Sequence, residues 1–238
     1  MGKGDFTHMK GLIYVADDEK NIRDLIKNFL VEAGHVVKVF ENGESLLNVF
    51  LEKEPTLVIL DVMMPEIDGF TTCNKIRKIS EVPIILLTAR DTDADYITGF
   101  TSGCDDYFTK PFSPLKLTMR VNAIVKRALK ERHTAQNKTL VLEDIVLEQA
   151  MKSCTINQKE VKLTNTEFEL MAYLIVNKDK AVSREELLRT IWGYGTEVET
   201  RVTDDTIKRI RKKLRDNQSK ISIETVWGYG FKIGRKDL

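Results

Sequence analysis

Five polar residues follow apolar runs in the first half of the chain, and their types could handle a phosphoryl group. Two acids, Asp17 and Asp18, follow LIYVA, and a third, Asp61, follows LVIL. Thr88 follows PIILL, and Lys110 follows DYFT. Three carboxylates at short range repel one another unless a cation or protons neutralise them. Such oxygens suit Mg²⁺, while an ammonium and a hydroxyl could hold phosphoryl oxygens and a carboxylate could act as the nucleophile.

The apolar runs before these residues are predicted to be strands of one sheet. The expected strands are 12–16, 36–40, 57–60, 83–87 and 106–109, and the expected helices are 20–33, 43–53, 69–79, 93–102 and 114–130. Strands that alternate with helices predict a parallel sheet with both faces covered. Ligands of such a sheet bind beyond the carboxyl ends of its strands. If the first and third strands are neighbours, the three carboxylates therefore converge.

The motifs around these residues resemble the receiver domain of two-component response regulators. The stretches that carry the resemblance are VADDE (15–19), ILDVMMPEIDGF (59–70), LLTA (86–89) and DDYFTKPFSP (105–114). The likeness spans residues 10–130. It implies an α/β fold with a flavodoxin-like five-stranded parallel sheet.

The resemblance implies a role for each polar residue of this sheet edge. Asp61 would be phosphorylated by a partner sensor histidine kinase, and Thr88, the Ala89 amide and Lys110 would hold the phosphoryl group. The peptide bond between Lys110 and Pro111 is expected to be cis.

The resemblance also implies an Mg²⁺ site. Asp18, Asp61 and the Met63 carbonyl would bind the ion, with Asp17 acting through water. The alternative is that each acid merely caps a following helix. Matching residue types at the ends of several strands make that coincidence improbable.

A switch and a dimer surface follow from the same resemblance. Phosphorylation would draw Thr88 toward the new oxygens and free space for Tyr107, although an aromatic residue in a strand can also serve only core packing. Asp106 and Arg120 match an ion pair through which relatives form dimers. Other positions depart from that pattern.

Two residues depart from the expected dimer pairing. Tyr96 and Lys116 stand where a basic and an acidic residue are expected. A homodimer formed on phosphorylation is still expected, because surface ion pairs contribute only about 0–1 kcal/mol each.

The second half of the chain follows a different pattern and carries the excess of basic residues. The predicted organisation is a receiver domain at 9–130, a polar linker at 131–138 and a smaller α+β domain at 139–236. A small antiparallel sheet (140–164), helices at 165–177, 183–192 and 201–215 and a hairpin at 221–233 are expected in it.

The stretch TIKRIRKKLR (206–215) holds six basic residues and no acid. Ile207, Ile210 and Leu214 have the spacing of a buried helix face, which leaves the basic side chains outside. A basic helix of this kind can form a nucleic-acid surface, be a solvated face, or bind an acidic protein partner.

Three longer stretches resemble the winged-helix effector domain of the OmpR/PhoB subfamily. They are residues 163–193, 200–214 and 223–233, and the likeness spans 140–234. It implies a recognition helix at 201–215 in the major groove of promoter DNA, a wing at 225–231 and a loop at 193–200 that faces RNA polymerase. The candidate DNA contacts are Arg201, Thr206, Lys208, Arg209, Arg211, Lys212, Arg215 and Trp227.

Two of these candidates depart from many relatives. A His is common where Thr206 stands, and an Arg where Trp227 stands. The indole of Trp227 either packs on sugar and backbone or covers the sheet.

The three cysteines are scattered without CxxC spacing, which argues against disulfides or a zinc site and for a reducing compartment. Neither a membrane span nor a signal peptide is apparent. The sequence therefore predicts a cytoplasmic transcription factor that is switched by phosphorylation and binds tandem half-sites.

Two alternatives are weighed against this prediction. An aspartyl-phosphate phosphohydrolase that used Asp61 would need a DxD pair there, where the sequence reads DVM, and a substrate-pocket domain, which is not apparent, so a turnover enzyme is not expected. A response regulator whose output is protein binding would not use the basic helix on DNA.

Overall fold

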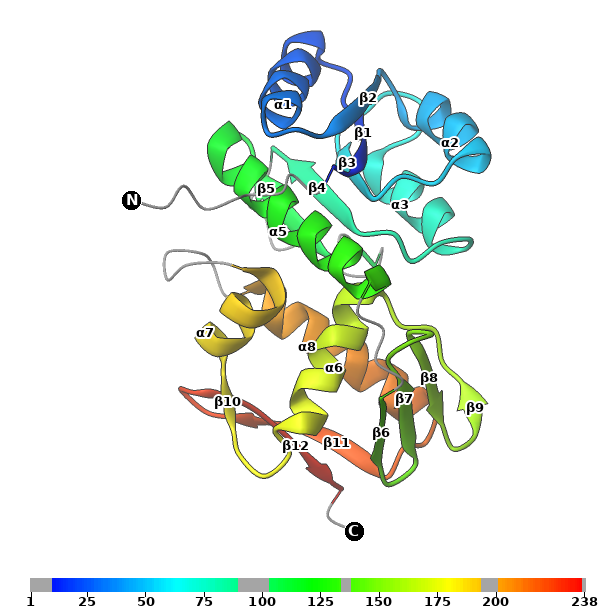
Figure 1. Cartoon of the computed structure of the whole chain (residues 1–238), viewed down its shortest axis with the longest axis vertical. Coiled ribbons are helices and arrows are strands. Elements are labelled where there is room, and N and C mark those ends of the chain that lie inside the picture. Colours follow the sequence, from blue (N-terminus) through cyan, green and yellow to red (C-terminus); the bar gives the residue numbers. More distant parts are fainter. Residues whose placement is uncertain (1–9, 90–102, 134–137, 194–200, 237–238) are drawn as a thin grey trace. The chain divides into compact units, whose positions relative to one another are not determined.

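The computed structural model describes residues 10–89, 103–133, 138–193 and 201–236 (Figure 1). The chain divides into two compact units after His133. Within the described ranges, no helix combines the length and the apolar character needed to cross a membrane.

The first unit is built on a five-stranded parallel sheet. Its strands are β1 (Leu12–Ala16), β2 (Val36–Phe40), β3 (Leu57–Asp61), β4 (Ile84–Thr88) and β5 (Asp106–Thr109). Their order is β2-β1-β3-β4-β5, and every neighbouring pair is parallel. This order is the predicted flavodoxin-like one, and it makes β1 and β3 neighbours.

Helices cover both faces of this sheet (Figure 1). They are α1 (Lys20–Glu32), α2 (Gly43–Glu52), α3 (Gly69–Arg77) and α5 (Pro114–His133). The helix predicted at 93–102 lies outside the described residues. Helix α5 continues beyond residue 130 into the predicted linker, because LKERH contains only good or moderate helix formers and no Pro or Gly.

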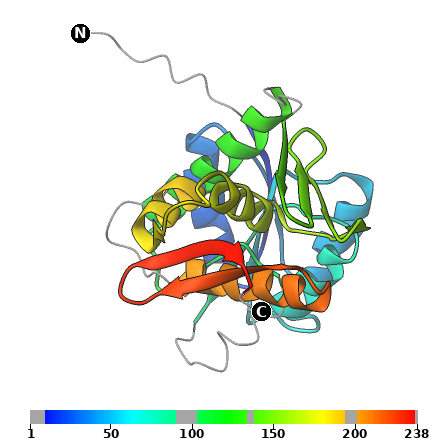
Figure 2. The ribbon, with the colours of Figure 1, turned by 90° about the horizontal axis from the view of Figure 1, so that it is seen from below.

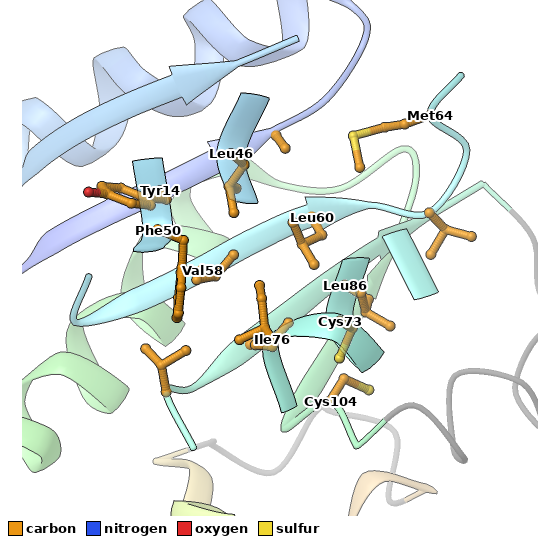
Figure 3. Packing of buried hydrophobic residues seen from close by; sticks show 14 residues of the cluster. Tyr14, Leu46, Phe50, Val58, Leu60, Met64, Cys73, Ile76, Leu86 and Cys104 are labelled. Carbon is orange, nitrogen blue, oxygen red and sulfur yellow. The ribbon is translucent and has the colours of Figure 1, made fainter. Parts of the chain in front are cut away.

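Two apolar layers explain why the central strands β1, β3 and β4 are runs of apolar residues. Tyr14, Val58 and Leu86 face α2 and α3 in one layer, which also contains Cys73 and Cys104 (Figure 3). The other layer packs the alternate strand residues, Ile13 and Ile59 among them, on α1 and α5. Since successive side chains point to opposite faces, a strand buried on both faces must be apolar throughout. All three cysteines are buried, and none of them forms a disulfide.

The second unit contains two small sheets and a helical layer. The strands β6 (Thr139–Leu142), β7 (Ile145–Glu148), β8 (Ser153–Ile156) and β9 (Lys159–Glu160) form an antiparallel sheet in sequence order. The helices are α6 (Asn165–Val176), α7 (Arg184–Leu187) with a π-helical turn at Leu188–Trp192, and α8 (Arg201–Asp216). The predicted helix at 183–192 is therefore α7 plus this turn.

The predicted hairpin is present and belongs to a three-stranded sheet. Strands β11 (Ile221–Val226) and β12 (Gly230–Arg235) pair with each other, and the short strand β10 (Val182–Ser183) pairs with β12. The hairpin lies beside α8 (Figures 1 and 2). Sequence patterns missed β10, because two residues are too few to show a period.

Candidate functional site

Three carboxylates meet at the carboxyl edge of the parallel sheet. Because Ala16 pairs with Leu60, the next residues, Asp17 after β1 and Asp61 at the end of β3, emerge side by side. Oxygens of Asp17, Asp18 and Asp61 all lie within 4.8 Å of one another. The first and the last of these side chains are buried, whereas Asp18 is exposed. We name this cluster the acid crevice.

Lys110, which directly follows β5, adds a positive charge to the acid crevice. Its Nζ lies 2.8 Å from Asp17 Oδ2, 3.0 Å from Asp61 Oδ1 and 3.6 Å from Glu19 Oε1. Its backbone N–H donates to the Thr88 carbonyl at 2.6 Å, which fixes the chain where β5 ends. The Lys110–Pro111 peptide bond is cis, as predicted.

The acid crevice is electrostatically crowded. Burial, and then repulsion from Asp17 and Asp18, raises the pKa of Asp61 to about 6 despite the opposing effect of Lys110. Burial also raises the pKa of Asp17. For Lys110, burial alone would lower the pKa, but hydrogen bonds to Asp17 and Asp61 raise it. The three carboxylates therefore carry more negative charge than the single ammonium of Lys110 neutralises, so a further cation would be stabilised in the acid crevice.

The donor set fits a hard divalent cation. Three carboxylates offer oxygen ligands, one of them is exposed to solvent, and Mg²⁺ favours carboxylate oxygens while keeping several waters. The Met63 side chain is exposed, two residues beyond Asp61. Asp17 already accepts hydrogen bonds on both oxygens, from the Glu19 N–H at 2.9 Å and from Lys110.

Helix capping does not account for these acids. The N-cap of α3 is Asp68, whose side chain accepts a hydrogen bond from the Thr71 N–H at 2.6 Å. The N-cap of α1 is Glu19, which makes no side-chain cap bond within the described residues. Asp61 ends a strand and caps no helix, so the alternative explanation is wrong for it.

Gly69 is a site residue that the sequence reasoning missed. Its N–H donates to the Val62 carbonyl at 3.1 Å, and a Cβ at this position would lie 2.2 Å from the Asp61 carbonyl oxygen. The loop after β3 can fold back on the strand end only because this residue has no side chain. The Asp-Gly dipeptide at 68–69 was the available signal.

The remaining receiver candidates lie on β4 and β5. Thr88 ends β4 and Ala89 follows it, exposed. Tyr107 pairs with Leu86, which lies two residues before Thr88 on β4. Because side chains two residues apart on a strand share a face, Thr88 and Tyr107 project from the same face of the sheet. The Tyr107 ring packs against the apolar layer that faces α2 and α3.

The predicted dimer pair is inside the receiver unit. Asp106 and Arg120 are each 2% exposed and form an ion pair with each other within one chain. Within one chain, the pair joins β5 to α5, and the expectation that these residues pair across a dimer stays a prediction. Lys116 is exposed on α5, and Tyr96 lies outside the described residues.

Helix α8 has the predicted buried face. Ile207 and Ile210 are fully buried and Leu214 nearly so. The exposed basic side chains are Lys208, Lys212 and Arg215. The side chain of Arg201 lies outside the described part of the chain, and so do residues 194–200 of the predicted polymerase-facing loop.

Other candidates on α8 serve the fold of the unit. Thr206 is 0% exposed and its hydroxyl donates to the Val202 carbonyl at 2.9 Å, so the expectation of a DNA contact is wrong for this residue. Arg209 is paired with the buried Glu167 at 3.0 Å, and Lys213 pairs with the same carboxylate. Sequence spacing could not reveal that Glu167, on α6, reaches this face.

The wing carries an exposed aromatic side chain. Trp227 is 92% exposed at the hairpin turn, where the Tyr229 N–H donates to the Val226 carbonyl at 3.0 Å. The alternative in which the indole covers the sheet is therefore wrong. Arg211 does not lie free on the helix surface, because it donates to the Ile223 carbonyl of the hairpin at 2.7 Å.

Comparisons with known proteins agree with this arrangement of two units. Residues 13–122 match the family model of the response regulator receiver domain, and residues 158–233 match that of the transcriptional regulatory protein C-terminal domain. The chain is 38% identical to the uncharacterized transcriptional regulatory protein YclJ of Bacillus subtilis, over 93% of this chain and 98% of the relative.

Two further similarities cover almost the whole chain. The transcriptional regulatory protein ResD of Bacillus subtilis is 36% identical, over 93% of this chain and 95% of its own length. The solved structure of a cysteine-to-serine mutant of RitR has a TM-score of 0.76 at 22% identity and covers 95% of this chain and all of its own. At that identity the likeness concerns the fold alone.

Proposed function

The chain belongs to the two-component response regulators of the OmpR/PhoB type, which control transcription by phosphorylation, and we propose that Asp61 is its phosphoacceptor. The observation that supports this proposal is the position of the Lys110 ammonium, which lies 3.0 Å from Asp61 and 2.8 Å from Asp17, the two buried acids of the cluster. An ion pair alone would not need a third carboxylate. A site for a transferred anion needs both the positive charge and a nucleophile beside it.

The transfer takes a phosphoryl group from a phosphohistidine of a sensor kinase. An oxygen of Asp61, ionised above its pKa of about 6, attacks phosphorus. The new O–P bond forms as the N–P bond breaks, and the imidazole leaves with the bonding electrons and takes up a proton. Lys110 donates to a phosphoryl oxygen, and the Thr88 hydroxyl and the Ala89 amide lie at the adjacent strand end to donate to others.

Asp17, Asp18 and Asp61, with the Met63 carbonyl, would hold Mg²⁺. The bound ion would supply positive charge against the phosphoryl oxygens and relieve the repulsion among the carboxylates. The exposed Asp18 would provide access for the ion. Asp17 is already bonded to Lys110 and to the Glu19 amide, which suits a role through water rather than direct ligation.

The switch would couple the new charge to the edge of the sheet. A phosphoryl group adds about −1.5 to −2 charges, and the Thr88 hydroxyl would turn toward it. Tyr107 projects from the same face one step away and could then move into the vacated space. The element so biased is the region around β5 and α5.

DNA binding is assigned to the exposed face of α8 and to the wing. Lys208, Lys212 and Arg215 would neutralise phosphates as the helix enters the major groove. Trp227 would pack on the sugars of the adjacent groove, a contact that carries no charge. Arg209 and Thr206 are left out of this surface, because both face the interior of the unit.

Partners follow from membership of the family. The phosphoryl donor would be a sensor histidine kinase, and the phosphorylated chain would form a homodimer on tandem half-sites about one helical turn apart. RNA polymerase would be the next partner in the promoter complex. Asp106 and Arg120, which pair within one chain here, would have to exchange partners to join two copies through this ion pair.

The experiment that tests the proposed function measures DNA binding with and without phosphorylation. Double-stranded DNA is selected from a random pool by the full chain treated with acetyl phosphate and Mg²⁺. We expect tighter binding by the treated wild type than by untreated protein, and no such gain for Asp61→Asn. Lys212→Gln should bind more weakly at every salt concentration. Equal gain for Asp61→Asn would contradict the assignment.

A further inference from the structure

The base of the wing is held by two guanidinium groups that sit over the same aromatic ring. Arg211 comes from α8 and Arg184 from the start of α7, and both approach Phe231 on β12. We infer that Arg211 and Arg184 are positioning residues that fix the wing against the recognition helix, and that Arg211 is not a phosphate contact. This inference rests on the proposed function, since it concerns how the DNA surface is assembled.

Arg211 is bonded to the hairpin rather than presented to solvent. Its Nε donates to the Ile223 carbonyl at 2.7 Å, and a terminal nitrogen donates to the Thr225 hydroxyl at 2.9 Å. Its guanidinium lies 5.8 Å from the centre of the Phe231 ring. Both acceptors are on β11, so one side chain of the recognition helix fixes the strand that leads into the wing.

Arg184 is the second guanidinium near the same ring. Its Nε and a terminal nitrogen donate to the two oxygens of Asp204 on α8, at 3.0 and 2.8 Å. Its backbone N–H donates to the Tyr229 carbonyl in the wing turn at 3.2 Å, and its guanidinium lies 4.6 Å from the Phe231 centroid. One residue therefore contacts the recognition helix, the wing turn and the wing strand.

The strands β10 and β12 pack closely against each other at the base of the wing. Val182 pairs with Phe231 and Ser183 with Gly230. A Cβ on Gly230 would lie 1.9 Å from the Val182 carbonyl oxygen, so the strands approach more closely there than a side chain allows. The wing turn, with Trp227 at its tip, thus starts from a base that is fixed on both sides.

The surroundings of the Arg211 guanidinium favour a positioning role over phosphate binding. Burial lowers the pKa of Arg211, Asp204 opposes this shift, and Arg215 and Arg184 add to it, so the guanidinium is largely withdrawn from water. Lys212, the next residue, is exposed. The planar fork of an arginine can donate in two directions at once, which a lysine ammonium on the same stem does not reproduce.

The test compares substitutions that keep or remove the charge at residue 211. Binding of the phosphorylated full chain to its selected DNA is measured over a series of salt concentrations for wild type, Arg211→Lys, Arg211→Gln and Lys212→Gln. Each lost phosphate contact should reduce the slope of log K against log salt by about 0.9. The neighbouring Lys212 variant is the reference for such a loss.

Positioning predicts that Arg211→Lys and Arg211→Gln weaken binding alike, by about tenfold or more, as expected for lost hydrogen bonds of a charged group. Their salt slopes should stay at the wild-type value, whereas Lys212→Gln should lower the slope. Hydroxyl-radical footprints should lose protection at the wing and keep it under α8. An Arg211→Lys variant that binds like wild type, or an Arg211→Gln variant whose slope falls like that of Lys212→Gln, would overturn the inference.

A second variant keeps the inference testable if the arginine variants fold poorly. Thr225→Val removes one acceptor of Arg211 without touching a charge. We expect it to show the same loss of wing protection, to a smaller degree, with an unchanged salt slope. Wild-type protection at the wing in this variant would count against the inference. Failure of the phosphorylated wild type to bind any DNA would instead contradict the proposed function.

Discussion

Replacement of Asp61 by asparagine should stabilise the receiver unit in metal-free buffer. At neutral pH the buried Asp61 carboxylate is charged beside two other acids, which is unfavourable. An asparagine amide of the same shape carries no charge there. Burial and then repulsion from Asp17 and Asp18 raise the pKa of Asp61 from 3.8 to about 6, with Lys110 opposing the shift. About two pKa units correspond to about 3 kcal/mol of unfolding free energy. Asp61 is only 2% exposed, so solvent does little to reduce this figure.

The gain should depend on pH in a defined direction. An acid whose pKa is raised on folding contributes stability below its unfolded pKa and loses that contribution as the pH rises through its folded pKa. The advantage of Asp61→Asn over wild type should therefore be near zero at about pH 4 and reach about 3 kcal/mol above about pH 7. Mg²⁺ should shrink the difference by binding to the wild type.

Hydrogen exchange in peptides that cover β3 would measure this difference. Fluorescence would not serve, because both tryptophans, Trp192 and Trp227, lie in the other unit. Asp24→Asn, at a half-exposed acid of α1, is the matched control and should change stability by no more than about 0.5 kcal/mol. A variant at Asp61 that is no more stable than wild type at about pH 8 without metal would refute the crowding argument.

Three further predictions concern the DNA-binding unit. Glu167→Gln should cost about 3–5 kcal/mol in urea unfolding followed by tryptophan fluorescence, because Arg209 and Lys213 lose their buried counter-charge. Burial would raise the pKa of Glu167, but those two cations lower it, so its contribution should be present above its unfolded pKa and vanish as the pH falls through the folded one; acid titration of stability checks this. Gly230→Ala should weaken wing contacts in a footprint, whereas Gly234→Ala, whose added methyl meets nothing within 4 Å, should not.

The receiver sheet could be predicted from the sequence because its central strands, β1, β3 and β4, are apolar runs with one clear pattern. A run such as LVIL is apolar at every position only if both faces are buried, and Asp61 then marks its end. Once the order of β1 and β3 is known, the pairing of Ala16 with Leu60 brings the acids together. This part of the candidate site therefore follows from local pattern plus topology.

The DNA-binding face could be predicted only in part. The spacing of Ile207, Ile210 and Leu214 correctly indicated the buried face of α8. It could not show that Glu167 would hold Arg209, because these residues are 42 positions apart and meet only in the folded unit. Basic residues on a helix thus divide between surface and interior according to partners that the helix sequence does not contain.

Two other features depend on packing between distant elements. Arg120 is a charged residue, a type expected at the surface, yet its side chain is buried and pairs with Asp106 on β5. The strand β10 has only two residues, and its pairing with β12 is visible only in three dimensions. Tertiary packing decided both features, and local propensity did not.

The central claim is that Asp61 accepts a phosphoryl group in the acid crevice. Its most direct test is to treat the full chain with acetyl phosphate and Mg²⁺, trap the acyl phosphate by borohydride reduction and locate the modified residue by mass spectrometry. The expected result is modification at Asp61 alone, strongly reduced when Mg²⁺ is chelated or Lys110 is replaced by alanine. Modification at another residue, or none at Asp61 in a folded, Mg²⁺-loaded chain, would contradict the claim.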